Sequence, residues 1–449
     1  MNRRILRLAV PNIISNITVP LLGMVDLALM GHLENKVYIG AVALGGMIFN
    51  FIYWGFGFLR MSTSGFVAQA FGRRNFPEVM LNLARPLGVA LVSGIGLVIL
   101  QIPIAALGFW VIDSSVEVEM LARQYFHIRI FAAPATISLY AFSGWFIGMQ
   151  NTRIPMVIAI TINLLNIGFS FLFVRGMGMA ADGVALGTVI AQYIGLLLAI
   201  LFMRKYYGRF LRYFDRGKVF ERAALWRFFH VNKDILIRTL CLILALSFFT
   251  AKSASMGDTP LAVNSLLLQF FMFFSFFIDG YAHAAEALTG RFIGAGNKAA
   301  LLKSIRLLFI WGAGVSAAYT LAYLFGGESI LRLLTSNAEV IEAARPYLIW
   351  PVIVPMVAFS AFLLDGIFIG ATASAAMRNS MLISTLGIYF PAYYLLAPHL
   401  GNNALWLALI LLLGARGITL ALMLRQAVIS PVQSSPESAA ATPDRSGSA

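Results

Sequence analysis

Long apolar runs, separated by short polar segments, dominate the chain. A helix that crosses a membrane needs about 20 mostly apolar residues, and runs of this kind recur along most of the sequence. They predict about twelve spanning helices, near residues 5–31, 38–70, 82–112, 117–147, 154–174, 182–204, 231–256, 261–292, 299–325, 338–370, 374–397 and 402–425. The pattern therefore predicts an all-α polytopic membrane protein, whereas the polar residues 430–449, rich in Pro, Ser and Ala, predict a disordered tail.

The composition supports a membrane protein. Of the 449 residues, 60% are hydrophobic and only 12% are charged, whereas soluble domains carry about 25% charged residues. Soluble enzymes, coiled coils and disordered scaffolds are therefore excluded as descriptions of the whole chain. The single cysteine, Cys241, lies in an apolar run, which excludes a disulfide framework. No small-residue cleavage site follows the basic N-terminus, so we expect a retained first helix rather than a signal peptide.

The positive charge is concentrated in alternate segments between the predicted helices. The chain carries 33 Lys and Arg against 19 Asp and Glu, a net charge of +14. With the N-terminus inside, most cations fall on the inner side, as the positive-inside rule requires, so we expect both termini to be cytoplasmic. The longest basic segment, residues 204–227, could instead bind anionic lipid or nucleic acid. Membrane topology accounts for it, and we expect no nucleic-acid partner.

The sequence also contains a weak internal repeat. The motif Gly-x-Phe-Ile-Gly occurs at 144–148 and again 222 residues later at 366–370, and Gly72-x-x-Asn75 recurs at the same offset as Gly294-x-x-Asn297. Six predicted helices separate the copies, an even number, so the halves should be parallel lobes around a central cavity, a transporter architecture. This predicts two pseudo-symmetric six-helix lobes and the following division of the chain: an N-terminal lobe (1–203), a basic cytoplasmic inter-lobe loop (204–230), a C-terminal lobe (231–429) and the tail (430–449).

One acidic residue lies within the first predicted span. Asp26 occurs in the run Leu-Leu-Gly-Met-Val-Asp-Leu-Ala-Leu-Met-Gly, with no basic residue within a helical turn. A charge near the bilayer centre costs at least about 2.5–3.5 kcal/mol, so such a residue is a functional candidate. We therefore predict that Asp26 binds and releases a coupling proton or cation. The alternative is an inert, hydrogen-bonded acid at the outer end of the helix.

Polar residues in the same half could surround this acid. Asn163, Asn166 and Ser170 follow i, i+3, i+7 spacing and share one face of the predicted helix 154–174. Such groups could hydrogen-bond Asp26 or coordinate a cation, although hydrogen bonding between packed helices would also explain them. The candidate polar site of the N-terminal lobe consists of Tyr140, Asn163, Asn166, Ser170, Thr188 and Gln192.

A second polar group lies in the other half. Asp279, His283 and Glu286 share a face of the predicted helix 261–292, and Asp234 lies one turn before Arg238 in the helix 231–256. A structural ion-pair network around Arg238 would explain them, and so would a second proton or cation site or a polar substrate wall. The full set is Asp234, Arg238, Asp279, His283, Glu286 and Asp365. Since there is no HExxH motif, we expect no bound metal other than a transported Na⁺, and no cofactor.

Two prolines, Pro11 and Pro20, precede Asp26 in the first predicted helix. A proline removes a backbone hydrogen bond and permits a kink. We predict a hinge here that couples protonation of Asp26 to a change of shape, although a kink can also be static. The sequence contains no GxxxxGK[ST] loop, so a P-loop ATPase is excluded and an ion gradient would have to supply the energy.

These features together resemble the multidrug and toxic compound extrusion (MATE) family of transporters. The residues that carry the resemblance are Pro11 and Asp26 with Val-Asp-x-Ala-x-x-Gly-His-Leu, and Gln69-Ala-x-Gly at the end of the second predicted helix. The text Asn232-x-Asp-Ile-x-Ile-Arg-Thr, followed by Asp279-Gly-Tyr-Ala-His-Ala-Ala-Glu-Ala-Leu, resembles the DinF-type branch. The resemblance covers roughly residues 5–425.

The resemblance implies a monomeric secondary transporter rather than an enzyme. Such a protein lies in the bacterial inner membrane and exports bulky, often cationic amphipaths against inward H⁺ or Na⁺ flow, by alternating access of the lobes. It implies that Asp26 is the coupling acid and that Asn166, with Tyr140 and Thr188 nearby, forms the polar site. Some relatives have a second acid where this chain has Ser170, which favours protons here. Na⁺ coupling, including Na⁺ at Asp365, and a lipid or metabolite flippase stay open as alternatives; a flippase would favour a strongly cationic cavity.

Overall fold

The fold is known from a computed structural model, which describes the backbone of residues 1–31, 37–111 and 115–433. Within α1, the side chains at 19, 21–22 and 24–31 lie outside the description, as do those at 111 and 433. Across the described residues the chain forms helices and no strand, and eleven helical segments are long and apolar enough to cross a membrane. The prediction of an all-α polytopic membrane protein is therefore confirmed.

The helices fall into two compact units. The N unit contains Ile14–Val67 and Asn75–Phe228, and the C unit contains Met1–Ile13, Ala68–Arg74 and the chain from Phe229 onward. Two long helices, α1 (Asn2–Gly31) and α2 (Val37–Gly72), contribute residues to both units.

Short segments from the first half of the sequence belong to the C unit because of specific contacts. The Gln69 side-chain amide donates hydrogen bonds to the Gly370 carbonyl at 2.9 Å and to the Thr372 hydroxyl at 3.2 Å. Near the N-terminus, Ile13 packs so closely on Gly280 that a side chain at Gly280 would collide with it.

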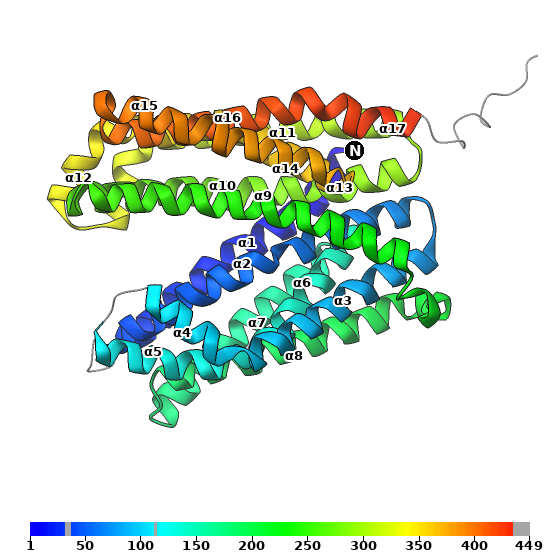
Figure 1. Ribbon diagram of the computed structural model, residues 1–449, viewed down its shortest axis with the longest axis horizontal. Helices are drawn as coiled ribbons and strands as arrows, with labels where there is room; N and C mark the ends of the chain where they lie inside the picture. The colour runs from blue at the N-terminus through cyan, green and yellow to red at the C-terminus, as the bar shows by residue number, and fades with distance from the viewer. Residues whose placement is uncertain (32–36, 112–114, 434–449) are drawn as a thin grey trace, which may run out of the picture. The chain divides into compact units, whose positions relative to one another are not determined.

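The N unit is built around the close packing of α7 with α8 and of α3 with α6 (Figure 1). Its remaining elements are α3 (Phe76–Ile99), α4 (Gln101–Val111), α5 (Val116–Arg129), η1 (Ile130–Ala132), α6 (Ala133–Gly148), α7 (Arg153–Phe171), η2 (Leu172–Gly176), α8 (Ala181–Tyr207), η3 (Gly208–Tyr213) and η4 (Arg216–Lys218).

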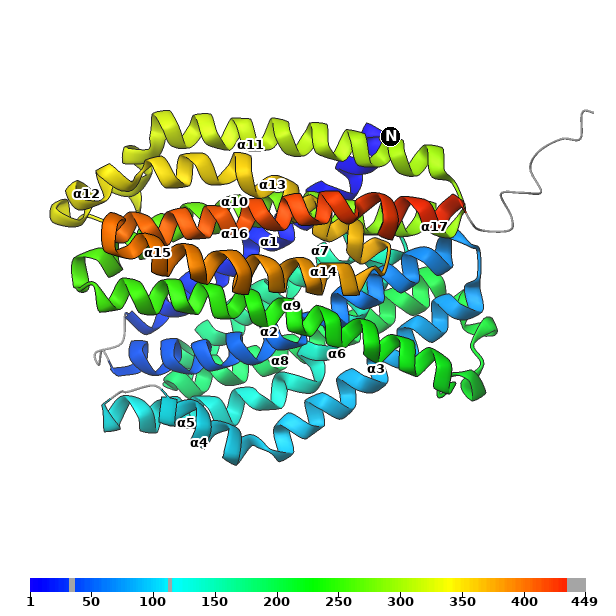
Figure 2. The ribbon, with the colours of Figure 1, turned by 45° about the horizontal axis from the view of Figure 1, so that its top comes forward.

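The C unit is centred on α13, which packs against α10, α11 and α16 (Figure 2). Its elements are α9 (Arg222–Ser255, from Phe229), α10 (Asp258–Gly294), α11 (Lys298–Leu334), α12 (Ala338–Ala344), η5 (Arg345–Tyr347), α13 (Ile349–Gly370), α14 (Ser374–Leu382), η6 (Ile383–Tyr389), α15 (Phe390–Leu400), α16 (Asn402–Leu424), η7 (Arg425–Ile429) and α17 (Ser430–Gln433).

Two of the predicted spans are broken by a residue outside any helix, Leu100 in one and Leu348 in the other, and a proline lies near each break. The predicted helix 82–112 begins earlier, at Phe76, and breaks at Leu100, three residues before Pro103, which has no N–H to continue the hydrogen-bond ladder. The predicted helix 338–370 is divided into α12 and α13 around Pro346. By contrast, α1 passes through both Pro11 and Pro20 as one helix, and the hinge there stays a prediction.

The ends of two other predicted segments also differ from expectation. The predicted loop 204–230 is largely helical, since α8 continues to Tyr207 and α9 already begins at Arg222. The predicted tail begins with a helical turn, Ser430–Gln433, and residues 434–449 lie outside the described residues.

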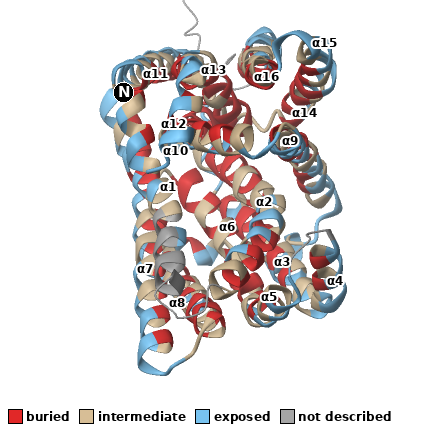
Figure 3. Cartoon of the chain, turned by 90° about the vertical axis from the view of Figure 1, so that its left-hand side faces the viewer, coloured by how far each residue is buried: buried red, intermediate tan, exposed pale blue. Residues whose placement is uncertain are grey.

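Burial follows the position of each helix within its unit. Buried residues gather along α13, whereas α11 and α15 carry many exposed ones (Figure 3). Large apolar side chains such as Val92, Ile99 and Leu422 are more than two-thirds exposed, at 75%, 72% and 76%. Such exposure suits contact with lipid, which is as apolar as the side chains themselves.

Candidate functional site

A cavity of about 330 Å³ lies within the N unit, between α2 and helices α5 to α8. Its volume lies within the range of small-molecule sites, about 300–1,000 Å³. Apolar residues, including Phe142, Phe146 and Ile158, form much of the wall. The polar lining consists of Tyr53, Arg129, Thr136, Tyr140, Ser143, Asn163, Thr188 and Gln192. An apolar pocket with a few convergent polar groups is the usual form of a ligand site.

The structure brings four of the six predicted N-lobe residues to this cavity, whereas Asn166 and Ser170 are not part of its lining. Tyr140, Asn163, Thr188 and Gln192 line the wall. Asn166 is buried behind Thr188, and its Nδ2 donates a 2.8 Å hydrogen bond to the Thr188 hydroxyl. That hydroxyl in turn donates to the Val184 carbonyl of its own helix at 2.9 Å.

Asn163 links the cavity wall to α1. Its Nδ2 donates a 3.2 Å hydrogen bond to the carbonyl of Thr18. Thr18 precedes Asp26 by eight residues on the same helix, about 12 Å along the axis. Asp26 itself lies within α1, but its side chain lies outside the described residues.

Two buried oxygen atoms on α7 lack hydrogen-bond partners among the described residues. They are Asn166 Oδ1 and Ser170 Oγ, on side chains that are 1% and 0% exposed. Gly187 of α8 brings the two helices close, since a Cβ there would lie 3.2 Å from Ser170 Oγ and 3.0 Å from the Ser170 backbone nitrogen. Buried polar atoms are nearly always satisfied, so a donor outside the described side chains, or water, would complete the hydrogen bonding of these two oxygens.

Four polar residues of the cavity lining were not among the sequence candidates: Tyr53, Arg129, Thr136 and Ser143. Arg129 ends α5, its Nη1 donates to the Tyr125 hydroxyl at 2.5 Å, and its guanidinium lies 4.9 Å from the Phe49 ring centroid. Tyr53 of α2 faces the same cavity. A signal for Arg129 was present, because an arginine inside the predicted span 117–147 is as costly in lipid as an acid.

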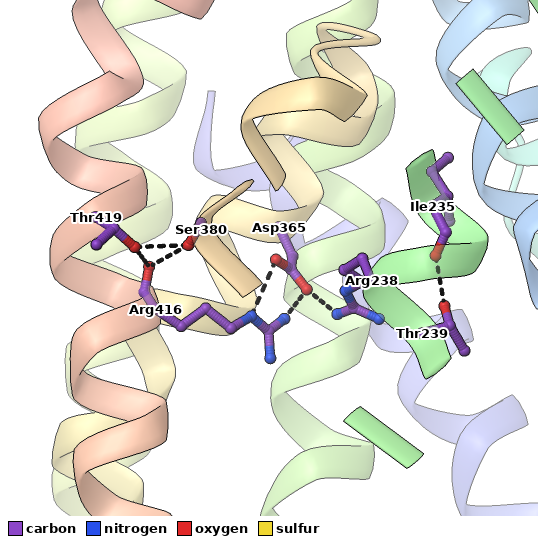
Figure 4. Close-up of polar contacts among 7 residues, drawn as sticks. All are labelled: Ile235, Arg238, Thr239, Asp365, Ser380, Arg416 and Thr419. Carbon is purple, nitrogen blue, oxygen red and sulfur yellow. Dashed lines mark hydrogen bonds and ion pairs between the residues drawn. The ribbon is translucent and has the colours of Figure 1, made fainter. Parts of the chain in front are cut away.

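The C unit contains a buried cluster of charged side chains, which we call the ion cluster (Figure 4). Asp365 of α13 forms ion pairs with both Arg238 of α9 and Arg416 of α16, and all three residues are at most 8% exposed. Asp279 of α10 also interacts electrostatically with both guanidinium groups. Two cations and two acids therefore join four helices. Arg416 was missed from the sequence, although it lies inside the predicted span 402–425.

The predicted neighbours Asp234 and Arg238 do not pair with each other. Asp234 instead accepts hydrogen bonds from Arg378 Nη1 at 2.6 Å and from the Ser374 hydroxyl at 2.9 Å. One helical turn on α9 thus separates two different ion pairs. Spacing along one helix left the partners of Asp234 and Arg238 open, and the structure places those partners on other helices.

The other members of the predicted C-lobe set lie on α10. Glu286 is fully buried, His283 is half-buried, and both have interaction partners. Within the described residues, no three His, Cys, Asp or Glu side chains are grouped so as to hold a metal ion. Glu286 also marks a close helix contact, since a Cβ at Gly370 would collide with its carbonyl oxygen.

Comparison with known proteins shows what this chain is similar to. A profile of the MatE family matches it twice, at residues 11–172 and 235–395. DNA damage-inducible protein F of Escherichia coli (strain K12) is 40% identical over 425 residues, which cover 93% of this chain and 91% of that protein. Probable multidrug resistance protein NorM of Thermotoga maritima is 23% identical over 77% of this chain and 75% of that protein. A crystal structure of MATE in the bent conformation has the same fold, with a TM-score of 0.85 over 98% of this chain and 97% of that chain, at 19% identity.

Proposed function

The chain belongs to the MatE family of multidrug and toxic compound extrusion transporters, and from this we propose that it exports amphipathic, often cationic compounds in exchange for inward-moving protons. It is a multi-pass membrane transporter and not an enzyme. Asp26 is the coupling acid, and export proceeds by alternating access. The protein works as a monomer in the bacterial inner membrane, with both termini in the cytoplasm.

The observation that carries this proposal is the pair of buried oxygen atoms on α7. Asn166 Oδ1 and Ser170 Oγ lack a partner in the described part of the chain, and both belong to the unit that contains the Asp26 segment of α1. A protonated carboxyl group can donate one hydrogen bond, which a carboxylate cannot. Protonation of Asp26 would therefore supply a donor for an acceptor of this kind and favour one arrangement of α1 against α7.

Sodium at Asp365 is a weaker alternative. Arg238 and Arg416 already occupy this carboxylate with two positive charges. A Na⁺ ion there would have to displace at least one buried guanidinium and would face the repulsion of the other. Sodium near Asp26 would need oxygen ligands. A site built from two carboxylates would use a second acid at position 170, where this chain has Ser170.

The other alternative is a different kind of transporter, a flippase for a lipid or a metabolite. Such a protein would favour a strongly cationic cavity, and the described lining contains Arg129 as its one cation. The aromatic and aliphatic wall fits an amphipath better than a polar headgroup. We therefore place drug-like amphipaths first among the substrates.

The test is transport by the purified protein in liposomes. Efflux of ethidium, a lipophilic cation, is followed under a pH gradient without sodium and, separately, under a sodium gradient at uniform pH. We expect efflux under the pH gradient alone, and its loss in Asp26→Asn. Asp258→Asn, an exposed acid at the start of α10, is the matched control and should transport like the wild type.

The outcomes separate the alternatives. Efflux that requires the sodium gradient and does not respond to the pH gradient would favour the Na⁺ antiporter. If Asp26→Asn transports as well as wild type under the pH gradient, the assignment of the coupling acid is wrong. If neither gradient drives ethidium, proton-coupled export of cationic amphipaths is overturned.

A further inference from the structure

The segment that joins α8 to α9, residues 204–227, is strongly basic and exposed. We call it the basic linker. It carries eight cations against two acids, Asp215 and Glu221, a net charge of +6. Each of the eight cationic residues is exposed in the structure: Arg204, Lys205, Arg209, Arg212, Arg216, Lys218, Arg222 and Arg227. None of them lines the N-unit cavity, so their concentration needs a separate explanation.

The basic linker is a folded element and not a loose loop. It contains the short helices η3 and η4, and α9 begins within it. Phe76 at the start of α3 stacks on Phe210 with ring centroids 4.8 Å apart and on Tyr213 at 5.9 Å. These contacts fix η3 against the N unit.

A buried arginine fixes the second half of the basic linker. Arg85 of α3 is 4% exposed. Its Nη2 donates to the Lys218 carbonyl at 2.9 Å and its Nε to the Val219 carbonyl at 3.2 Å, while Glu78 accepts from its Nη1 at 2.8 Å. A surface that is ordered in advance loses less conformational entropy when it binds a ligand.

Aromatic rings accompany the cations on this surface. Phe220 and Trp226 are 80% and 67% exposed, which a purely aqueous surface would disfavour. Arg209 lies 5.0 Å from the centroid of the Phe210 ring and Arg212 lies 4.7 Å from that of Tyr213. Mixed aromatic and basic side chains are characteristic of the membrane interface, where the rings enter the headgroup region and the cations meet phosphates.

The position of the basic linker in the chain agrees with this chemistry. Both flanking segments, Ala181–Tyr213 and Arg222–Ser255, are long and apolar enough to cross a membrane. A folded segment that joins two spanning helices lies at a membrane surface. Lipid headgroups are therefore the nearest anions, and exposed rings such as Phe220 and Trp226 favour them over a nucleic acid.

We propose that the basic linker is a binding surface for anionic phospholipids, in which Arg209 and Arg212 contact the headgroup phosphates. Their guanidinium groups can make two parallel hydrogen bonds to one phosphate. The bound lipid holds η3 and, through the stacking of Phe76 on Phe210 and Tyr213, the first turn of α3. This inference does not depend on which ion or substrate the protein transports.

The experiment measures lipid binding by the full-length, purified protein. Native mass spectrometry follows the binding of phosphatidylglycerol, with phosphatidylcholine of the same acyl chains as the neutral reference. The test variant is Arg209→Gln with Arg212→Gln. The matched control is Lys303→Gln with Arg306→Gln, which removes two exposed cations from the first turns of α11. A third variant, Arg209→Lys with Arg212→Lys, keeps the charge.

We expect the test variant to bind phosphatidylglycerol about 25-fold more weakly, at about fivefold for each cation. The α11 control should bind like the wild type, and the lysine variant should recover most of the affinity. Millimolar inorganic phosphate should not displace the lipid, because it offers no apolar contact for the rings. The thermal unfolding midpoint of each variant establishes that the fold is intact.

Several results would overturn the proposal. One is equal loss of lipid in the linker variant and the α11 control, which would indicate general attraction by net charge. A second is unchanged lipid binding in the linker variant. A third is displacement of the lipid by inorganic phosphate, and a fourth is its displacement by a short DNA duplex that is present at a lower concentration than the lipid. Because no gradient or substrate is involved, failure here leaves the transport proposal standing, and the reverse also holds.

Discussion

The same helix contact occurs once in each unit, 222 residues apart. In the N unit, the motif 144–148 on α6 packs against α2, where a Cβ at Gly144 would collide with the Arg60 carbonyl and one at Gly148 would lie 2.8 Å from the Ser64 carbonyl. In the C unit, the motif 366–370 on α13 packs in the same way on the backbone of α10. The carbonyl groups that it contacts belong to residues 222 positions after Arg60 and Ser64. Glycine is required at both places because the backbones approach too closely for any side chain.

The turns around these contacts also correspond. Asn75 and Asn297 each cap the following helix with their side-chain oxygen, at 3.1 Å and 2.9 Å from the backbone nitrogen three residues later. Gln150 and Thr372, two residues after each motif, both adopt positive φ, 64° and 55°. The two units therefore share a scaffold down to single backbone conformations.

The polar chemistry built on this scaffold differs between the units. Asp365, in the ion cluster of the C unit, corresponds by position to Ser143, which lines the cavity of the N unit. Arg129, which faces that cavity, corresponds to Pro351. The repeat therefore specifies the helix packing, whereas the polar and charged residues placed on that packing differ between the two units.

The largest expected effect is the loss of the C-unit cluster. Asp365→Ala leaves Arg238 and Arg416 buried side by side without the carboxylate that joins them, and breaking a buried pair in this way costs about 3–5 kcal/mol. The unfolding midpoint in detergent, measured by size-exclusion chromatography after heating, should fall sharply. Ser143→Ala at the corresponding N-unit position should change it little. Equal midpoints for the two variants would contradict the distinction between the units.

A smaller and symmetric effect is expected at the shared scaffold. Gly148→Ala and Gly370→Ala each force a methyl group against a neighbouring helix, and such overpacking costs about 1–3 kcal/mol. Both variants should lose stability to a similar degree in the same thermal assay. Gly314→Ala on α11, where a Cβ would meet nothing within 4 Å, is the control and should be neutral or slightly stabilising. A large loss in one unit and none in the other would show that the two contacts are not equivalent.

The third prediction concerns the N-unit polar site. Thr188→Val removes the acceptor for Asn166 Nδ2 while keeping the shape of the side chain, and a lost hydrogen bond of this kind costs about 1 kcal/mol. Thr188→Ser keeps the hydroxyl and should restore stability. If the site is functional, Thr188→Val should also lower pH-driven ethidium efflux by more than its stability explains, and Thr188→Ser should not.

How far the sequence predicts this molecule depends on the range of the interaction. Helices such as α10 were predictable because length and apolar composition are local properties, and the offset between the two glycine motifs predicted the repeat. The polar face of α7 was predictable from the spacing of Asn163, Asn166 and Ser170. The family resemblance implied that Thr188 lies near Asn166, and the structure adds that the two side chains form a hydrogen bond.

Partners across helices were the part that the sequence could not supply. The partners of Asp234 and Arg238 are Arg378 and Asp365, which lie 144 and 127 residues away along the chain. Arg129 and Arg416 lie within predicted spans, where an arginine is as costly as an acid, but their sequence neighbours do not identify their partners. Their significance depends on what surrounds them, which is a property of the fold.

The smallest expected effect tests whether burial, and not the number of ion pairs, makes the Asp365 cluster important. Glu328 also lies between two arginines, Arg332 at 2.8 Å and Arg345 at 2.9 Å, but all three side chains are at least 43% exposed. Exposed pairs contribute little because water solvates the separated charges nearly as well. Glu328→Gln should therefore leave the unfolding midpoint unchanged within error, at low and at high salt. A drop comparable to that of Asp365→Ala would mean that pairing itself, irrespective of burial, stabilises the C unit.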